Sequence, residues 1–517
     1  MADGAGRGRP ADGGAGGSDA AGPVGGGAAD GAEAAVGGGA ADVARTAGVA
    51  RPDVARTADV AKADVARADD SGLRRSLKSR HLQMIALGGI IGASLFIGSG
   101  AVIETVGPAA VLSYALGGAI VVLVMRMLGE MATAAPALGS FMEYARASLG
   151  GWAGFTIGWL YWYFWVGVVA FEAVAGAKLL QPLLPSVPQW VFSLLLMVLL
   201  TGTNLVSVRS FGETEFWLAS VKVVTIVVFL ALGALFVLGL WPGADFSVGN
   251  IALDGFFATG GFSVVHGVVI VIFSYFGTEI VTIVSSESDE PERAVAKATK
   301  AVVWRVLLFY VGSVALLVMI TPWGDIPSET SPFAAAFARF GIPAAGTVVN
   351  VVVFTAVLSV LNSGLYTASR MLFALRRHGF APNWIQDVNA RGVPWKAILL
   401  STLVGYVAVA MSYVAPDTIF YFIINSAGAV ALFVYAIIAM SQLRMRRRLE
   451  RESPELLKLR MWLFPYLTWA TLALIAAVVL TMGLIGETRS QLGLSLVSLA
   501  AILLVYVAFV RRRAAVS

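Results

Sequence analysis

The chain has 517 residues, of which 58% are hydrophobic and only 13% are charged, and this balance is not that of a soluble protein. It predicts an integral membrane protein. With no cysteine and only three scattered histidines, the sequence excludes disulfides and thiolate metal sites and indicates no metal centre and no bound cofactor. The formal charge of +5 does not indicate a nucleic-acid partner, because the basic residues lie at the ends of apolar runs rather than in a basic domain.

Residues 1–72 are predicted to be a disordered, low-complexity cytoplasmic tail. They consist almost entirely of Ala, Gly, Asp, Arg, Val and Thr, and they lack the contiguous apolar stretch of an export signal. A short basic stretch follows the tail. Residues 73–513 are then expected to form a single membrane domain.

The membrane domain contains repeated apolar runs that are long enough to cross a bilayer as helices. Lys and Arg gather in the loops on the side of the N-terminus, whereas the opposite loops hold little beyond Arg339 and Arg489. Because positively charged loops stay in the cytoplasm, we expect a multi-pass protein of the cell membrane with both termini cytoplasmic. About twelve spans are expected, at residues 83–103, 108–128, 151–178, 189–207, 215–240, 262–284, 301–320, 346–374, 396–413, 417–440, 462–483 and 491–510.

Two of these spans contain glycine in the middle of an apolar stretch. The first span reads "GGIIGASLFIGSG" from Gly88, and the sixth reads "FSYFGTEI", in which Gly277 lies close to the carboxylate of Glu279. Since the two are five spans apart, spans 1–5 and 6–10 would be inverted repeats, each headed by a broken helix. This pattern is typical of transporters whose site lies at the midplane of the membrane. The alternative is that the glycines only allow helices to pack closely.

A broken helix leaves backbone groups free to bind a substrate. The N–H groups at the start of a half-helix are unpaired, and together with the helix dipole they favour an anionic group such as a carboxylate. Carbonyl groups freed at the other broken end can accept hydrogen bonds from an ammonium group. A zwitterion suits this arrangement. Phe273 and Tyr275 are candidates to cap such a pocket, with plain packing as the alternative role.

Few ionisable side chains fall within the predicted spans, where each is costly to bury in hydrocarbon. Lys222 lies several residues into the fifth span, where it either exchanges a proton during transport or extends toward the cytoplasmic surface. Arg126 and Glu130 are four residues apart in the second span and are expected to form an ion pair. Glu172 in the third span has no evident partner.

Several motifs resemble those of the bacterial amino acid permeases of the amino acid, polyamine and organocation superfamily. The motifs are "GGIIGASLF", "RMLGEMA", "GWLYWYFW", "EFWLASVKV", "FGTEIVTIVSSESDEPERAV" and "LNSGLYTASRML", and the resemblance runs from about residue 80 to about residue 513. Within the family, "GASLF", "EIVTI" and "SQLRMR" are most similar to the 4-aminobutyrate (GABA) permeases. The resemblance implies an all-α, LeuT-type fold of twelve helices, with two inverted repeats of five, that imports an amino acid together with a proton.

The resemblance also implies a substrate site formed by the two broken helices. Backbone and hydroxyl groups of the first break would donate hydrogen bonds to the substrate carboxylate. Phe273 would be the gating aromatic, and nearby carbonyls would accept hydrogen bonds from the ammonium. Ser94 stands where many relatives have glycine, which favours a substrate without an α-ammonium group. The implied substrate-binding residues are Gly92, Ala93, Ser94, Phe273, Phe276 and Gly277.

Two residues are implied in proton coupling. Lys222 matches the lysine of the fifth span that occupies the place of a sodium ion in proton-coupled relatives. Glu279 matches the glutamate of the sixth span, which would either relay protons or brace the unwound segment. The implied partners are therefore a small amino acid, protons and the lipid bilayer.

We weigh three hypotheses for the function. The first is a proton-coupled importer of GABA or a related ω-amino acid across the cytoplasmic membrane, and the second is a permease for aromatic, basic or small neutral α-amino acids. The third is a non-transporting amino acid sensor that signals through its tail, although the tail has no motif of its own. An enzyme is not expected, because the sequence contains neither a nucleophile, base and metal constellation nor a nucleotide-binding loop.

Overall fold

The computed structural model describes most of the membrane domain, and the predicted tail at residues 1–72 lies outside it. Within the described part the chain is helical and forms no strand. Nine described helical segments are long and apolar enough to cross a bilayer, and a shorter apolar helix covers Trp395–Met411. The described residues are 79–88, 91–137, 139–242, 249–251, 253–285, 291–326, 331–414 and 427–510.

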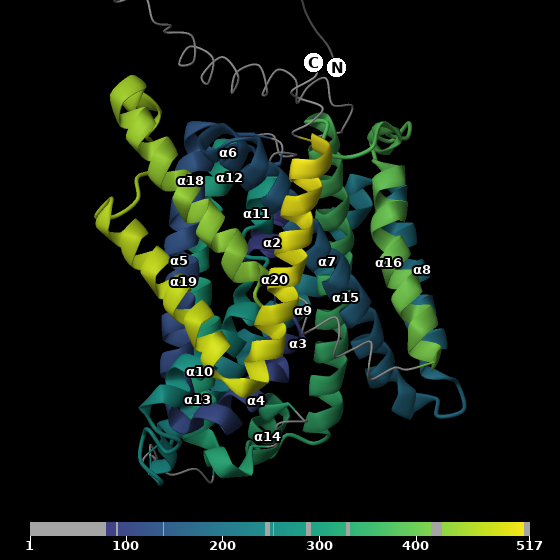
Figure 1. The fold of residues 1–517 in the computed structure, drawn as a ribbon. Coiled ribbons are helices and arrows are strands. Elements are labelled where there is room, and N and C mark those ends of the chain that lie inside the picture. Colours follow the sequence, from purple (N-terminus) through teal and green to yellow (C-terminus); the bar gives the residue numbers. More distant parts are fainter. Residues whose placement is uncertain are drawn as a thin grey trace, which may run out of the picture. The chain divides into compact units, whose positions relative to one another are not determined.

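Each of the twelve predicted spans contains helix in the structure (Figure 1). For the tenth span this holds for its second half, because residues 415–426 lie outside the described part. The spanning elements, in chain order, are α2 (Ser79–Gly88), α3 (Ala93–Phe96), α4 (Gly98–Val106), α5 (Ala110–Ala134), α7 (Gly151–Leu180), α8 (Gln189–Val206), α9 (Val208–Val237), α10 (Gly261–Tyr275), α11 (Ile280–Val284), the π-helical η5 (Arg305–Gly312) with α13 (Ser313–Ile320), α15 (Ala345–Arg377), α16 (Trp395–Val414), α18 (Val430–Glu452), α19 (Tyr466–Leu484) and α20 (Gly486–Val505).

Three further helices connect the spans: α6 (Phe141–Leu149), α12 (Pro291–Trp304) and α14 (Pro332–Arg339). In Figure 1, α6 and α12 lie at one end of the helical bundle and α14 lies at the other. α6 and α14 are not among the segments long and apolar enough to cross a bilayer, whereas α12 from Arg293 onward forms the start of the candidate span Arg293–Ile320. α6 and α14 therefore cover the ends of the spanning helices.

The first and sixth predicted spans are both broken. Gly92 is extended before α3 begins, and a second irregularity at Ile97 separates α3 from α4. In the sixth span α10 ends before Phe276, which is extended, and Gly277 has a φ of +103°, a conformation that glycine adopts without steric cost. The predicted discontinuous helices are confirmed at both positions.

The broken sixth span lies in the interior of the helical bundle. In the most apolar window of Gly261–Val284, 89% of the residues are buried, whereas in that of Thr488–Ala508 only 6% are. α10 packs against α5, and α15 packs against α7, α9 and α16. Because the interior helices carry the breaks and the buried polar side chains, the functional groups lie away from the lipid-facing surface.

α18 is longer than predicted. It continues from the membrane to Glu452, whereas the apolar run was expected to end at residue 440. Ion pairs one turn apart support the extra turns, since Arg446 and Arg448 contact Glu450 and Glu452, each at 2.8 Å. Apolar length alone therefore underestimates a helix that continues beyond the hydrocarbon.

Candidate functional site

A cavity of about 830 Å³ lies beside both helix breaks. Its wall comes mainly from the first break, α7, α10 and α15. Five of the six residues expected to bind substrate line it, namely Gly92, Ala93, Ser94, Phe273 and Phe276. The sixth, Gly277, is not among the lining residues, and its N–H donates to the Glu279 carboxylate. The structure thus brings the two broken segments together around one space.

Aromatic rings form much of the wall of this cavity. Phe164 on α7 packs edge-to-face on Phe276 with ring centres 4.3 Å apart, and its ring centre lies 5.8 Å from that of Phe273. Tyr275 does not line the cavity, because it is fully buried and its hydroxyl donates to the Tyr114 carbonyl at 2.9 Å. Of the two aromatic residues considered as caps, Phe273 lies at the cavity and Tyr275 packs elsewhere.

Glu172 on α7 also lines the cavity, a position that the sequence did not reveal. Its side chain is 5% exposed, and one carboxylate oxygen, Oε2, has no hydrogen-bond partner among the described residues. A methyl group at Gly92 would lie 3.4 Å from the other oxygen and 3.0 Å from a methyl group of Val360. A methyl group there would therefore be tightly packed where the first break approaches α7 and α15. The signal available in the sequence was an ionisable residue in an apolar span.

Lys222 is fully buried and does not extend to the surface. Its Nζ donates to Ser359 Oγ on α15 at 2.7 Å, and the Ser359 hydroxyl donates to the carboxylate of Glu215. Glu215 lies seven residues before Lys222, on the same face of α9, and is also fully buried. The sequence analysis missed Glu215, although the spacing within "EFWLASVK" carried the signal.

Two asparagines extend this polar chain toward α8. Asn362 on α15 donates to the second oxygen of Glu215 at 3.2 Å. The carbonyl oxygen of Asn362 in turn accepts a hydrogen bond from Asn204 on α8 at 3.0 Å. Both amides are buried, so the chain from Lys222 to Asn204 lies wholly inside the protein.

Glu279 lies in the unwound part of the sixth span and is fully buried. Its carboxylate accepts hydrogen bonds from the Gly277 N–H at 3.0 and 3.2 Å and from the Tyr435 hydroxyl at 3.3 Å. Arg305, at the start of η5, is also buried and donates to the hydroxyl of Thr278 in the same segment. Glu279 therefore connects the break to α18.

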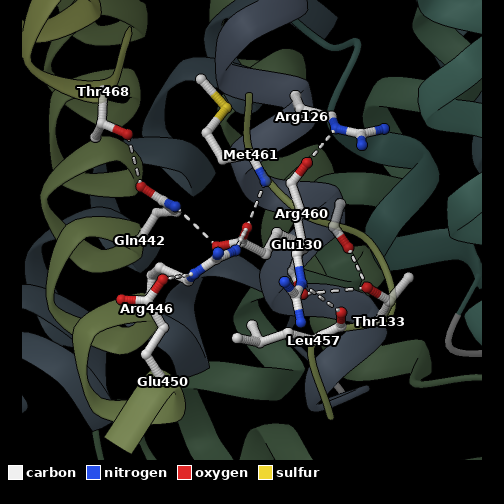
Figure 2. A network of polar contacts seen from close by, with 11 residues as sticks. Arg126, Glu130, Thr133, Gln442, Arg446, Glu450, Leu457, Arg460, Met461 and Thr468 are labelled. Atoms are coloured by element: carbon white, nitrogen blue, oxygen red, sulfur yellow. Dashed lines mark hydrogen bonds and ion pairs between the residues drawn. The ribbon is translucent and has the colours of Figure 1, made fainter. Parts of the chain in front are cut away.

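The expected ion pair between Arg126 and Glu130 is not formed. Glu130 is buried and bonds instead to Arg446 of α18 at 2.5 Å, to Gln442 at 2.8 Å and to the backbone N–H of Met461 (Figure 2). A buried carboxylate needs several hydrogen bonds, and these partners supply them from a distant part of the chain. The helical spacing of Arg126 and Glu130 gives no sign of these partners, because they are distant in sequence.

Arg126 has its own partners in the segment before α19. Its Nε donates to the Arg460 carbonyl at 2.9 Å, and its guanidinium carbon lies 4.9 Å from the ring centre of Trp462. In Figure 2 this side chain bonds to Arg460 rather than to Glu130. Arg126 and Glu130 thus bond separately to neighbouring residues of the segment before α19, and both bonds hold the same end of α5.

A second ionic cluster joins α6 to the end of α15. Glu143 contacts His378 at 2.7 Å and accepts from Arg146 Nε at 3.0 and 3.1 Å. Burial alone would raise the pKa of Glu143, but the hydrogen bonds and charges of His378 and Arg146 outweigh this effect and lower the pKa to about 2. The carboxylate is therefore held ionised, and it anchors α6.

The comparisons with known proteins identify the family of this chain. A family profile described as "Amino acid permease" matches residues 81–516. The chain belongs to the amino acid permease family. The gamma-aminobutyric acid permease of Bacillus subtilis (strain 168) is 49% identical over 446 residues, which cover 86% of this permease and 95% of that protein. The gamma-aminobutyric acid permease of Escherichia coli (strain K12) is 45% identical, with coverage of 78% and 88%.

Other relatives of this amino acid permease are less similar. The aromatic amino acid transport protein AroP of Escherichia coli (strain K12) is 39% identical over 411 residues, with coverage of 79% and 90%. Among solved structures, a manganese transporter of Eremococcus coleocola is 14% identical and has a TM-score of 0.53, covering 83% of this chain and 92% of that one. At this identity the likeness concerns the fold alone. It confirms the predicted LeuT-type fold.

Proposed function

We propose that this permease is a proton-coupled symporter that imports 4-aminobutyrate, or a related ω-amino acid, across the cytoplasmic membrane. The observation that carries the proposal is the 49% identity with a GABA permease over 95% of the length of that protein. The aromatic amino acid transport protein of Escherichia coli K12, which represents the alternative class of substrate, is 39% identical. The higher identity with the GABA permease favours an ω-amino acid as the substrate.

The substrate lies in the cavity beside the two helix breaks. Its carboxylate accepts hydrogen bonds from the first break, where the N–H groups of Ala93 and Ser94 begin α3. Its ammonium binds carbonyls near Phe273 and Phe276, and the turn at Gly277 keeps this part of the backbone unwound. A volume of about 830 Å³ is ample for a small zwitterion.

Lys222 and Glu279 couple transport to protons. Lys222 is buried against Ser359, where a gain or loss of its proton changes the charge inside the protein. Glu279 accepts hydrogen bonds from the Gly277 N–H, and a protonated carboxyl accepts them more weakly. Protonation of Glu279 therefore alters the unwound segment beside the substrate.

The topology follows from the distribution of charge. The protein lies in the cell membrane with both termini in the cytoplasm, because Lys and Arg gather in the loops on that side. The activity is transport rather than catalysis.

Competition for uptake tests the substrate. The full chain is reconstituted in proteoliposomes, and uptake of labelled GABA is measured with a hundredfold excess of unlabelled GABA, phenylalanine, lysine or alanine. We expect unlabelled GABA to suppress uptake at least tenfold and the α-amino acids to have little effect. If the protein takes up labelled phenylalanine, lysine or alanine but no GABA, GABA is not its substrate, although the assignment to the amino acid permease family still holds.

A further inference from the structure

We propose that Ser359 and Glu215 form a proton relay, which carries the coupled proton from Lys222 toward the cytoplasmic end of α9. The inference rests on the proposed function, because it requires Lys222 to hold the coupled proton. It adds a defined acceptor for that proton, Glu215, and a defined route, the hydroxyl of Ser359.

The three side chains form a continuous line of hydrogen bonds with a single direction. Lys222 Nζ donates to Ser359 Oγ at 2.7 Å, and Ser359 Oγ donates to Glu215 Oε1. A serine hydroxyl has one proton to donate and lone pairs that accept, so Ser359 can do both at once. All three residues are fully buried, which separates the relay from bulk solvent.

The transfer conserves atoms and charge. A proton leaves Lys222 Nζ and forms a new O–H bond at Ser359, while the original hydroxyl proton of Ser359 moves to Glu215 Oε1. One N–H bond and one O–H bond break, and two O–H bonds form. The charged pair of ammonium and carboxylate becomes a neutral amine and a carboxylic acid, with no change in net charge.

The relay passes through Ser359, which precedes a cavity-lining residue, and leads toward the start of α9. Val360, which follows Ser359 on α15, lines the cavity. Glu215 lies seven residues before Lys222, which on a helix corresponds to about 10 Å along α9. In the proposed topology α9 begins at the cytoplasmic side, so a proton on Glu215 is closer to the cytoplasm than one on Lys222.

Neighbouring groups position the acceptor and act on the donor. Asn362 donates to the second oxygen of Glu215 at 3.2 Å and is itself bonded to Asn204, so these amides fix the carboxylate as positioning residues. The other charged side chains that act electrostatically on Lys222 are Glu172 on α7 and Arg305 of η5. Of the acidic groups around Lys222, Glu215 is the one linked to it through the hydroxyl.

Two nearly isosteric substitutions at Ser359 test the relay. Ser359→Thr keeps the hydroxyl, whereas Ser359→Val removes it. For each full-length variant in proteoliposomes we would measure exchange of labelled for unlabelled GABA at equal pH, and GABA-induced proton influx with an enclosed pH dye. We expect Ser359→Val to keep exchange within about threefold of the wild type and to lose proton influx at least tenfold. Ser359→Thr should keep both.

Ser193→Ala on α8 is the matched control, since it removes a buried hydroxyl whose oxygen has no partner among the described residues. Both activities should remain as in the wild type. Proton influx in Ser359→Val equal to that of the wild type would overturn the relay. So would loss of exchange in Ser359→Val with exchange kept in Ser359→Thr, because the hydroxyl would then serve binding or folding.

If neither Ser359 variant exchanges GABA, the same two assays on Glu215→Gln test the relay instead. Exchange without proton influx supports Glu215 as the acceptor, whereas retention of both activities, or loss of both, overturns it. Failure of the proposed function gives a different result in the wild type itself. A wild type that does not exchange GABA refutes the substrate, and one that exchanges GABA without proton influx refutes the coupling.

Discussion

Lys222 is the buried residue on which the proposed coupling mechanism depends. Its side chain has no solvent exposure, and its Nζ donates to Ser359 within a hydrogen-bond line that ends on Glu215. A buried charge without partners is unstable, and a hydrogen-bonded partner of opposite sign offsets that cost. The contacts therefore make it possible to keep a titratable group in the membrane interior.

We predict that Lys222→Met reduces gradient-driven accumulation of GABA at least tenfold and removes the dependence of uptake on external pH. Methionine has a similar length but cannot carry a proton. The measurement is initial uptake in proteoliposomes at external pH values from 5.5 to 8. Lys300→Met, at an exposed position on α12, is the control and should behave like the wild type. A pH-dependent Lys222→Met protein would show that the proton is held elsewhere.

Gly92 provides a second prediction at the scale of the residue. We predict that Gly92→Ala raises the KM for GABA at least fivefold, because the new methyl group would lie 3.0 Å from Val360 and 3.4 Å from Glu172 in the cavity wall. Gly202→Ala on α8 is the matched control, since its methyl group would meet nothing within 4 Å. An unchanged KM in Gly92→Ala would place the substrate away from the first break.

At the scale of elements, buried carboxylates hold the helices together across long stretches of sequence. Glu130 of α5 bonds to Arg446 of α18, which lies 316 residues away, and Glu143 of α6 bonds to His378 after α15. Each contact joins a short or terminal part of one helix to the end of another. These ends are held by side-chain contacts in addition to apolar packing.

A double-mutant cycle tests the partner of Glu130. We predict that Glu130→Gln and Arg446→Met each destabilise the protein by roughly 3–5 kcal/mol and that the double variant is much less destabilised than their sum, because the two side chains form one buried pair. Combined with Arg126→Met, Glu130→Gln should instead show a much smaller coupling energy, because the two side chains share no hydrogen bond. Thermal unfolding in detergent measures both cycles. Strong coupling with Arg126, and none with Arg446, would contradict the observed pairing.

The elements differ in how far the sequence predicts them. The spans and both breaks are predictable, because apolar length and mid-span glycine are local features of the chain. The partner of Glu130 is not predictable, because the helical spacing indicates Arg126, whereas the observed partner, Arg446, is distant in sequence. Likewise the place of Lys222 in an apolar run predicts either a proton-exchanging residue or a side chain that extends toward the surface. The contact between Ser359 of α15 and Glu215 of α9 depends on the packing of two helices that are distant in sequence.

At the scale of the whole molecule, acid stability depends on ionised carboxylates outside the spans. Hydrogen bonds and charges from His378 and Arg146 lower the pKa of Glu143 to about 2, below its ordinary value of 4.5, although burial opposes this. A lowered pKa in the folded state means that the ionised form stabilises the fold. This contribution is complete above pH 4.5 and is lost as the pH falls through about 2.

We therefore predict that the melting temperature of the wild type falls as the pH is lowered from 6 to 3 in detergent. Glu143→Gln should be less stable than the wild type at pH 6, by about 1–3 kcal/mol for the lost charged contacts, and its stability should change less with pH. The difference between the two curves should shrink as the pH falls from 4.5 toward 3. A constant difference between them across this range would contradict the role of the ionised carboxylate.

The central claim is that this amino acid permease uses a proton gradient to concentrate GABA. The most direct test is accumulation of labelled GABA in sodium-free proteoliposomes, with an inward proton gradient imposed and then collapsed by a protonophore. The account predicts that internal GABA rises well above the external concentration under the gradient and returns to equilibrium when the gradient is removed. Accumulation that requires sodium, or that never exceeds the external concentration, would contradict it.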